Sequence, residues 1–549
     1  MAPQRPSTRG LLILLGSLAL ATEVPAAGPP AGRGSHADLV ALYGQFQASL
    51  TPARVAGSDD HSDAAVAARL DALARQRAQL ADLNVAGWPR AQQVDWLLVR
   101  SEMLRREFEL RVLRPWARDP GFYVDPLLQL AFTELPLSAE ARAPFEERLR
   151  RVPAELAAAR ANLDAVAGDL AALALRNLER ADGVGHEQPP RPVPPAGVIG
   201  WYDDLLERAR RQQPELAPAI AGAAAAVREF RDWLAANRAT MTAPAGMGAA
   251  RLDWYLRHVK LLPYDSAQLL TLGAREEQRM RAFLALERWR NRGLAELQPA
   301  GSAADYAARI ADADAAVRAH IVAQDLLTIP ADIGEFDHNV PWMVRPGGRN
   351  FWEEVQFRDP RPDHVHAVIP GHRFDLRLAR RMQHPIRAGY SEGARVEGWA
   401  VYLEEMFLQT GFLDARPRTR ELFYLFGLKR ASRVHVDVMM QRNLIDVPRA
   451  VSYMRERVPW LDEDVARVDA EIYLRYPPGY GFGYTIGRVQ MDRLLADRAR
   501  QLGERFDLKA FHDEFLAAGL LPIALIRYQM TGLDDEVEGF WDVAPIPAG

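Results

Sequence analysis

Apolar residues recur at intervals of three and four along most of the chain, which is the spacing of amphipathic α-helices. Three stretches show it most clearly: Asp63 to Leu83, Ala91 to Leu113 and Phe145 to Leu178. They are rich in Ala, Leu, Arg and Glu, which favour helices, whereas runs of alternating β-branched residues are nearly absent. The pattern predicts a large, mainly α protein with few short strands.

Prolines and glycines interrupt this pattern. Gly183 to Gly200 and Thr242 to Ala250 are predicted to be loops or linkers, and the irregular stretch Ile329 to Asp363 could hold short strands or a loop that faces a substrate. We find no internal repeat at a fixed period. We therefore expect a helical region at 28–240 and a C-terminal region at 241–549, which could form one continuous domain.

The N-terminus has the pattern of a secretory signal peptide at 1–27. Arg5 and Arg9 precede an apolar run from Leu11 to Ala21, and small residues suitable for cleavage lead up to Ala27. The run is shorter than the roughly 20 residues needed to span a bilayer, and no later segment approaches that length. We predict an exported, periplasmic or extracellular protein with no membrane span in its mature chain. An uncleaved N-terminal anchor is the alternative.

Composition narrows the possible chemistry. The formal net charge of −4 gives no basic surface for nucleic acid, which we do not expect as a partner. The sequence has no cysteine, which excludes disulfides, thiolate metal ligands, a cysteine nucleophile and a lipid-bearing cysteine. There is no Gly-x-Ser-x-Gly elbow to support a serine hydrolase. Any metal must be held by His, Asp or Glu.

The segment HVHAVIPGH, from His364 to His372, has three histidines within nine residues. Zinc helices place two histidines four residues apart, with a glutamate beside the first. His366 and His372 are six apart, which on a regular helix separates them by about 9 Å along the axis. Pro370 and Gly371 would break such a helix, and a distorted turn could bring both imidazoles together. Spacing alone leaves metal ligation and loop histidines both open.

Two further segments combine aromatic residues with glutamates in one case and with glycines in the other. Glu397 and Glu404 are seven residues apart and should share one helix face; a carboxylate buried there needs a metal or an arginine as partner. The segment from Tyr476 to Leu494 lacks the Gly-Lys-Ser/Thr ending of a phosphate loop. A glycine-aromatic turn that leads into a helix fits better, with Tyr480 and Tyr484 free to face a cleft.

A final candidate is His512, on a predicted helix that ends near Gly519. A lone helical histidine is more often structural than catalytic, so the residue by itself decides nothing.

In this order, four segments resemble the bacterial DUF885 family of zinc metallopeptidase-like proteins. Its members typically show His-Glu-x-x-Pro-Gly-His, Glu-Gly-Trp-Ala-x-Tyr-x-Glu, Pro-Gly-Gln-x-x-x-Tyr-x-x-Gly and Phe-His-Asp followed by Gly and Pro. The matching text here is HAVIPGH, EGWAVYLE, PGYGFGYTIG and FHDEFLAAGLLP. The resemblance covers most of the C-terminal half and, more loosely, the N-terminal helices.

The resemblance implies a gluzincin-like helical fold with two lobes and a central cleft, acting on a peptide or small amide. By position it implies zinc as cofactor, with three ligands: His366, His372 and Glu397. Tyr484 and His512 would be catalytic residues that polarise a carbonyl or hold a tetrahedral intermediate. Glu404 would be a structural carboxylate that contacts the metal ligands without binding the metal itself.

Several positions depart from the family pattern. The glutamate after the first histidine is Ala367 here, and that glutamate would be the general base, a role worth about 10²–10⁴-fold in rate. Tyr480 replaces a glutamine, Gln441 stands where relatives tend to have histidine, and Asp375 replaces another glutamine. Neighbouring acids that could replace the base are Asp363, Glu353 and Glu354.

Three hypotheses follow. The chain is a zinc hydrolase of the peptidase type whose base is not residue 367, or an inactive pseudopeptidase that binds a peptide or partner in its cleft, or a helical scaffold without metal. Ala367 is the feature that most favours the second.

Overall fold

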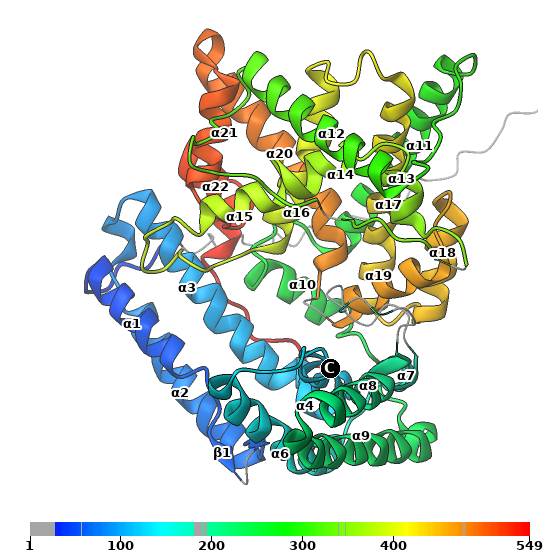
Figure 1. Ribbon diagram of the computed structural model, residues 1–549. Coiled ribbons are helices and arrows are strands. Elements are labelled where there is room, and N and C mark those ends of the chain that lie inside the picture. Colours follow the sequence, from blue (N-terminus) through cyan, green and yellow to red (C-terminus); the bar gives the residue numbers. More distant parts are fainter. Residues whose placement is uncertain are drawn as a thin grey trace, which may run out of the picture.

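The computed structural model describes residues 28–55, 58–180, 189, 191, 195–338, 340–345, 347–475 and 478–548. The predicted signal peptide at 1–27 and much of the predicted loop at 183–200 lie outside these residues. The described chain is mainly α (Figure 1), as the apolar periodicity predicts.

The first half of the chain contains the one described sheet, an antiparallel pair of two-residue strands in which Arg54 is opposite Asp59. Its elements are α1 (His36–Ala48), β1 (Arg54–Val55), β2 (Ser58–Asp59), α2 (Asp63–Ala81), η1 (Val85–Gly87), α3 (Arg90–Phe108), η2 (Glu109–Leu113), α4 (Pro115–Arg118), α5 (Gly121–Ala131), α6 (Ala139–Asn162), α7 (Gly168–Glu179), α8 (Gly197–Gln212), η3 (Pro214–Leu216), α9 (Ala217–Asn237), η4 (Arg238–Thr240), α10 (Ala249–His258) and α11 (Ser266–Arg290).

The second half contains helices and loops, with no strand among its described residues. Its elements are α12 (Ala303–Ala323), α13 (Phe351–Gln356), α14 (Arg361–Asp363), η5 (His364–Val368), α15 (His372–Ala379), α16 (Gly393–Gln409), α17 (Pro417–Gln441), α18 (Val447–Arg457), α19 (Glu463–Arg475), α20 (Tyr480–Leu502), η6 (Gly503–Arg505), α21 (Leu508–Ala517), α22 (Ile523–Thr531) and η7 (Glu538–Phe540).

The stretch from Ile329 to Asp363 forms no strand in its described residues, so short strands there were the wrong alternative. An irregular loop leads instead into α13, where the Asn350 side chain accepts a hydrogen bond from the Glu353 amide and starts the helix.

The predicted helix from Phe145 to Leu178 is broken between α6 and α7. The backbone between them pairs with other segments: Ala165 N–H donates to the Ala117 carbonyl and Ala167 N–H to the Arg118 carbonyl, each at 3.1 Å. These long-range bonds replace helical ones, a tertiary effect that local periodicity does not contain.

Two buried apolar clusters make up most of the core. One lies within α5 to α9 and the segments joining them, from Val124 to Met241. The other joins α1 to α3 with α16, α17 and the helices that follow, so the first helices share a core with the C-terminal half. A buried ion pair of 2.6 Å between Asp95 on α3 and Arg387 crosses the same junction. The region boundary at 240/241 stays a prediction.

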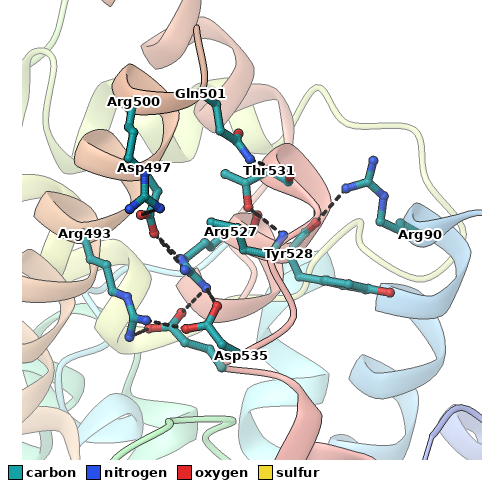
Figure 2. A network of polar contacts seen from close by, with 11 residues as sticks. Arg90, Arg493, Asp497, Arg500, Gln501, Arg527, Tyr528, Thr531 and Asp535 are labelled. Carbon is teal, nitrogen blue, oxygen red and sulfur yellow. Dashed lines mark hydrogen bonds and ion pairs between the residues drawn. The ribbon is translucent and has the colours of Figure 1, made fainter. Parts of the chain in front are cut away.

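The C-terminal helices are tied together by a network of ion pairs (Figure 2). Arg527 on α22 contacts Asp497 on α20 and Asp535, both at 2.7 Å, and Arg493 on α20 contacts Glu536 at 2.8 Å. The network fixes α22 against α20.

Helices α16 and α20 cross at very short distance. A Cβ at Gly398 would lie 2.5 Å from the Gly487 backbone, and one at Gly487 would lie 2.0 Å from the Ala394 carbonyl oxygen. Only glycine permits this approach, which brings the start of α20 beside Glu397. Gly487 of the PGYGFGYTIG segment thus serves helix packing. Among the described residues, no helix combines the length and apolar character needed to cross a bilayer.

Candidate metal centre

His366 and His372 meet because the helix between them is distorted. His366 lies in the π-helical turn η5, the chain then turns through a cis Ile369–Pro370 bond, and His372 begins α15. A Cβ at Gly371 would lie 1.7 Å from the His366 carbonyl oxygen, so the turn requires glycine. The two Nε2 atoms lie 3.1 Å apart, which confirms that a distorted turn can join the two imidazoles.

Glu397 completes a triangle of potential ligand atoms. Its Oε2 lies 3.2 Å from His372 Nε2 and 3.5 Å from His366 Nε2. Zinc held tetrahedrally at 2.0–2.1 Å places its ligand atoms roughly 3.3 Å apart, so the triangle has the right size. Glu397 is 4% exposed, and its Oε2 is buried without a hydrogen-bond partner in the described part of the chain. These three residues are a group that could hold a metal ion.

The charges in this triangle are strongly coupled. Burial alone would raise the pKa of Glu397, but the charge on His372 and the contacts of both histidines hold that pKa well below its usual range. Burial alone would lower the pKa of His372, but the Glu397 carboxylate outweighs it and raises that pKa. The ionised carboxylate is the form that binds a cation.

A second carboxylate lies behind His366. Oε1 of Glu404 is 2.8 Å from His366 Nδ1, and Oε2 of Glu404 is 2.6 Å from Arg430 on α17. Glu397 and Glu404 therefore share one face of α16, as their spacing predicts. A carboxylate on the outer nitrogen of an imidazole fixes its orientation and raises its basicity. The corresponding Nδ1 of His372 has no hydrogen-bond partner among the described residues.

Two tyrosines from the first turns of α20 reach the site. The Tyr480 hydroxyl donates to Oε1 of Glu397 at 2.5 Å, and the Tyr484 hydroxyl donates to Tyr480 at 3.2 Å. The Tyr484 ring lies parallel to that of His366 at 6.2 Å. Burial, reinforced by the Glu397 charge, raises the pKa of both tyrosines, so both stay protonated donors. The sequence marked Tyr480 as a residue that could face a cleft and as a departure from the family pattern, but it did not predict the bond to Glu397.

His512 is fully buried, with both ring nitrogens engaged. Nδ1 lies 2.7 Å from the Leu326 carbonyl and Nε2 lies 2.8 Å from the Tyr402 hydroxyl. Burial lowers the pKa of His512 to about 4, so the ring is neutral. Nδ1 must then carry the proton for the carbonyl, and Nε2 accepts from Tyr402. The predicted catalytic role of His512 stays a prediction.

Ala367, which replaces the glutamate expected as general base, is buried. Ala367 is 6% exposed and offers only a methyl group beside His366. Of the acids considered as replacements, Glu353 bonds Arg345 and the Asn350 amide, and Glu354 bonds Arg358. Asp363 is buried and its Oδ2 has no hydrogen-bond partner in the described structure.

The other departures lie in structural contacts. Gln441 donates to the carbonyls of Tyr473 and Leu474 at 3.0 and 3.2 Å. Asp375 forms a buried ion pair with Arg395, with one contact at 3.1 Å. Each side chain satisfies buried polar groups of its neighbours.

Fold and site together define a mainly α protein with a buried His-His-Glu group suited to a metal. The model of the family described as bacterial protein of unknown function (DUF885) matches residues 52–328 and 364–530, and the chain belongs to this family. No curated protein matches the sequence.

Solved structures share the fold. One is a candidate lipoprotein of unknown function from Shewanella oneidensis, with 18% identity, a TM-score of 0.68, and coverage of 90% of this chain and 100% of that one. Another is a candidate lipoprotein from Colwellia psychrerythraea, with 16% identity, a TM-score of 0.65, and coverage of 90% and 98%.

Proposed function

We propose that this chain is a zinc-dependent hydrolase of peptide or small amide bonds. The observation that supports it most is the convergence of His366 Nε2, His372 Nε2 and Glu397 Oε2 on a triangle of 3.1 to 3.5 Å. Two histidines and one glutamate are a ligand set of catalytic zinc sites, which keep a further position open. Zinc held there would polarise a carbonyl and lower the pKa of a water molecule.

The surrounding residues have separate roles in this proposal. Glu404 orients His366, and Arg430 balances the charge of Glu404. Tyr480 and Tyr484 both stay protonated; the Tyr480 proton is held by Glu397, and Tyr484, whose bond to Tyr480 is 3.2 Å long, is the donor that can turn to a substrate carbonyl. Such donors hold the negative charge that develops on a carbonyl oxygen under attack.

The proton from the attacking water needs an acceptor other than residue 367. Asp363 is the strongest of the acids considered, because one of its buried oxygens has no hydrogen-bond partner in the described structure, whereas Glu353 is saturated. Asp363 also precedes Ala367 by four residues in the same distorted helix.

Ala367 supports a second candidate function. A pseudopeptidase would keep the metal triangle and bind a peptide or partner in a cleft between two helical lobes, without turning it over. The methyl group at this position cannot take a proton, which is the observation in favour of this alternative.

We further propose that the protein is exported to the periplasm or beyond. The signal-peptide pattern at 1–27 supports export, as does the description of the Shewanella and Colwellia proteins as candidate lipoproteins.

Turnover of a mixed peptide library separates the two functions. The hydrolase cleaves peptides in a chelator-sensitive manner, and His372→Ala abolishes cleavage together with bound zinc. If the native chain is inert and Ala367→Glu gains chelator-sensitive cleavage, the pseudopeptidase is correct. If the native chain is active and Ala367→Glu adds nothing, the base lies elsewhere, with Asp363→Asn as the next variant.

A further inference from the structure

A hollow of about 440 Å³ lies where the end of α11 meets the first turns of α17, apart from the metal ligands. Small-molecule sites typically measure about 300–1,000 Å³, so the hollow is large enough for a ligand. The charged residues that line it are Arg288, Arg292, Arg358, Arg418, Glu296 and Glu421.

The positive charge of this hollow is not balanced within it. Arg418 contacts both lining acids, Glu296 at 3.1 Å and Glu421 at 3.0 Å. In the described structure, neither Arg288, in the last turn of α11, nor Arg292, two residues beyond that helix, has an acidic group within ion-pair distance; one nitrogen of Arg292 donates to the Trp289 carbonyl at 2.7 Å. The Arg288 guanidinium and the remaining N–H donors of Arg292 are therefore available to an anion.

Exposed tryptophans accompany these arginines. Trp460 lines the hollow and is 46% exposed, and Trp289 on α11 is 66% exposed. The Arg358 guanidinium lies 4.6 Å from the centre of the Trp460 ring, and that of Arg292 lies 4.0 Å from the centre of the Trp289 ring. Large exposed apolar groups beside charge commonly mark binding surfaces. The hollow thus combines arginine side chains with the apolar surface of Trp460.

Helix electrostatics explain only part of this arrangement. Arginines at the end of α11 stabilise the negative pole of that helix. That accounts for the position of Arg288 but not for the exposed tryptophans, for Arg358 arriving from the segment after α13, or for the open volume. The opposite pole of α17, which is positive, borders the same space and also favours an anion.

We propose that this hollow binds an amphiphilic organic anion, with a phosphate or carboxylate group between Arg288 and Arg292 and an apolar part against Trp460. A free amphiphilic anion and an anionic phospholipid both have this chemistry.

Isothermal titration calorimetry of the full chain with octyl phosphate, below its micelle-forming concentration, tests the proposal. Two control compounds are titrated in the same way. Inorganic phosphate has the anionic group of octyl phosphate without its alkyl chain, and octyl glucoside has the alkyl chain without the anionic group. The double variant Arg288→Gln/Arg292→Gln removes the proposed anion contacts. Arg290→Gln is the matched control, because Arg290 is an exposed residue of the same helix that does not line the hollow.

Saturable binding of octyl phosphate is expected, at least about tenfold tighter than inorganic phosphate and weakened at least about tenfold in the double variant but not in the control. Retention on vesicles that contain an anionic phospholipid, lost in the double variant, would assign the ligand to a lipid; binding of the soluble compound alone would assign it to a free amphiphile. The absence of saturable binding, equal binding of octyl glucoside, or unchanged binding by the double variant would overturn the proposal.

Discussion

The Tyr480 hydroxyl donates a 2.5 Å hydrogen bond to Oε1 of Glu397, while Oε2 of the same carboxylate faces His366 and His372. One oxygen is thereby held by the protein and the other is aimed at the histidines. Such a carboxylate is suited to bind a metal through a single oxygen.

Tyr480→Phe should weaken zinc binding about tenfold or more, because Oε1 of Glu397 loses its donor in a buried position. Zinc affinity is measured by competition with a fluorescent chelator. Tyr484→Phe is the control: it leaves the Tyr480–Glu397 bond intact and should change the affinity much less. Equal effects of the two variants would show that Tyr480 has no special role.

Glu404→Gln should reduce zinc affinity about 10- to 100-fold, because His366 loses its carboxylate and Arg430 loses its ion pair. Glu405→Gln is the matched control on the same helix, since Glu405 pairs with Arg279 instead. The same chelator competition applies, with circular dichroism to confirm folding. A Glu404→Gln variant that retains native affinity would contradict the orienting role.

Zinc affinity should decrease as the pH is lowered, and the decrease should begin above pH 6.5. His372 must be neutral to bind, and Glu397 raises the pKa of His372 in the metal-free protein, so protons compete at a higher pH than for an ordinary histidine. Titrations between pH 8 and pH 5.5 measure this dependence. An affinity that stays constant down to pH 6 would be incompatible with the coupling.

His512→Asn should lower the free energy of unfolding by about 1–3 kcal/mol, because the Tyr402 hydroxyl loses its buried acceptor. Zinc content should stay unchanged. Turnover of the folded, zinc-loaded variant decides the catalytic role: a loss beyond about 10²-fold would support it, and native turnover would remove it.

The sequence predicts the helices well, because burial of one face imposes the three-to-four spacing directly on the residues. It does not predict the break between α6 and α7, since the backbone partners of Ala165 and Ala167 come from the distant segment around Ala117. Long-range hydrogen bonds of this kind leave no local pattern.

The three candidate ligands could be named from the family resemblance, but their contacts could not be predicted. The shared face of Glu397 and Glu404 follows from their spacing. The convergence of His366 with His372 depends on a turn geometry that spacing left open. The partners Arg430 and Tyr480 come from other helices, so neither contact could be derived from the segments alone.

The most direct test is the zinc content of the purified full chain, measured by mass spectrometry of metals alongside His372→Ala. The proposed centre predicts about one equivalent of zinc in the native protein and its loss in the variant. Less than about a tenth of an equivalent, with no difference between the two proteins and no uptake of added zinc, would contradict it.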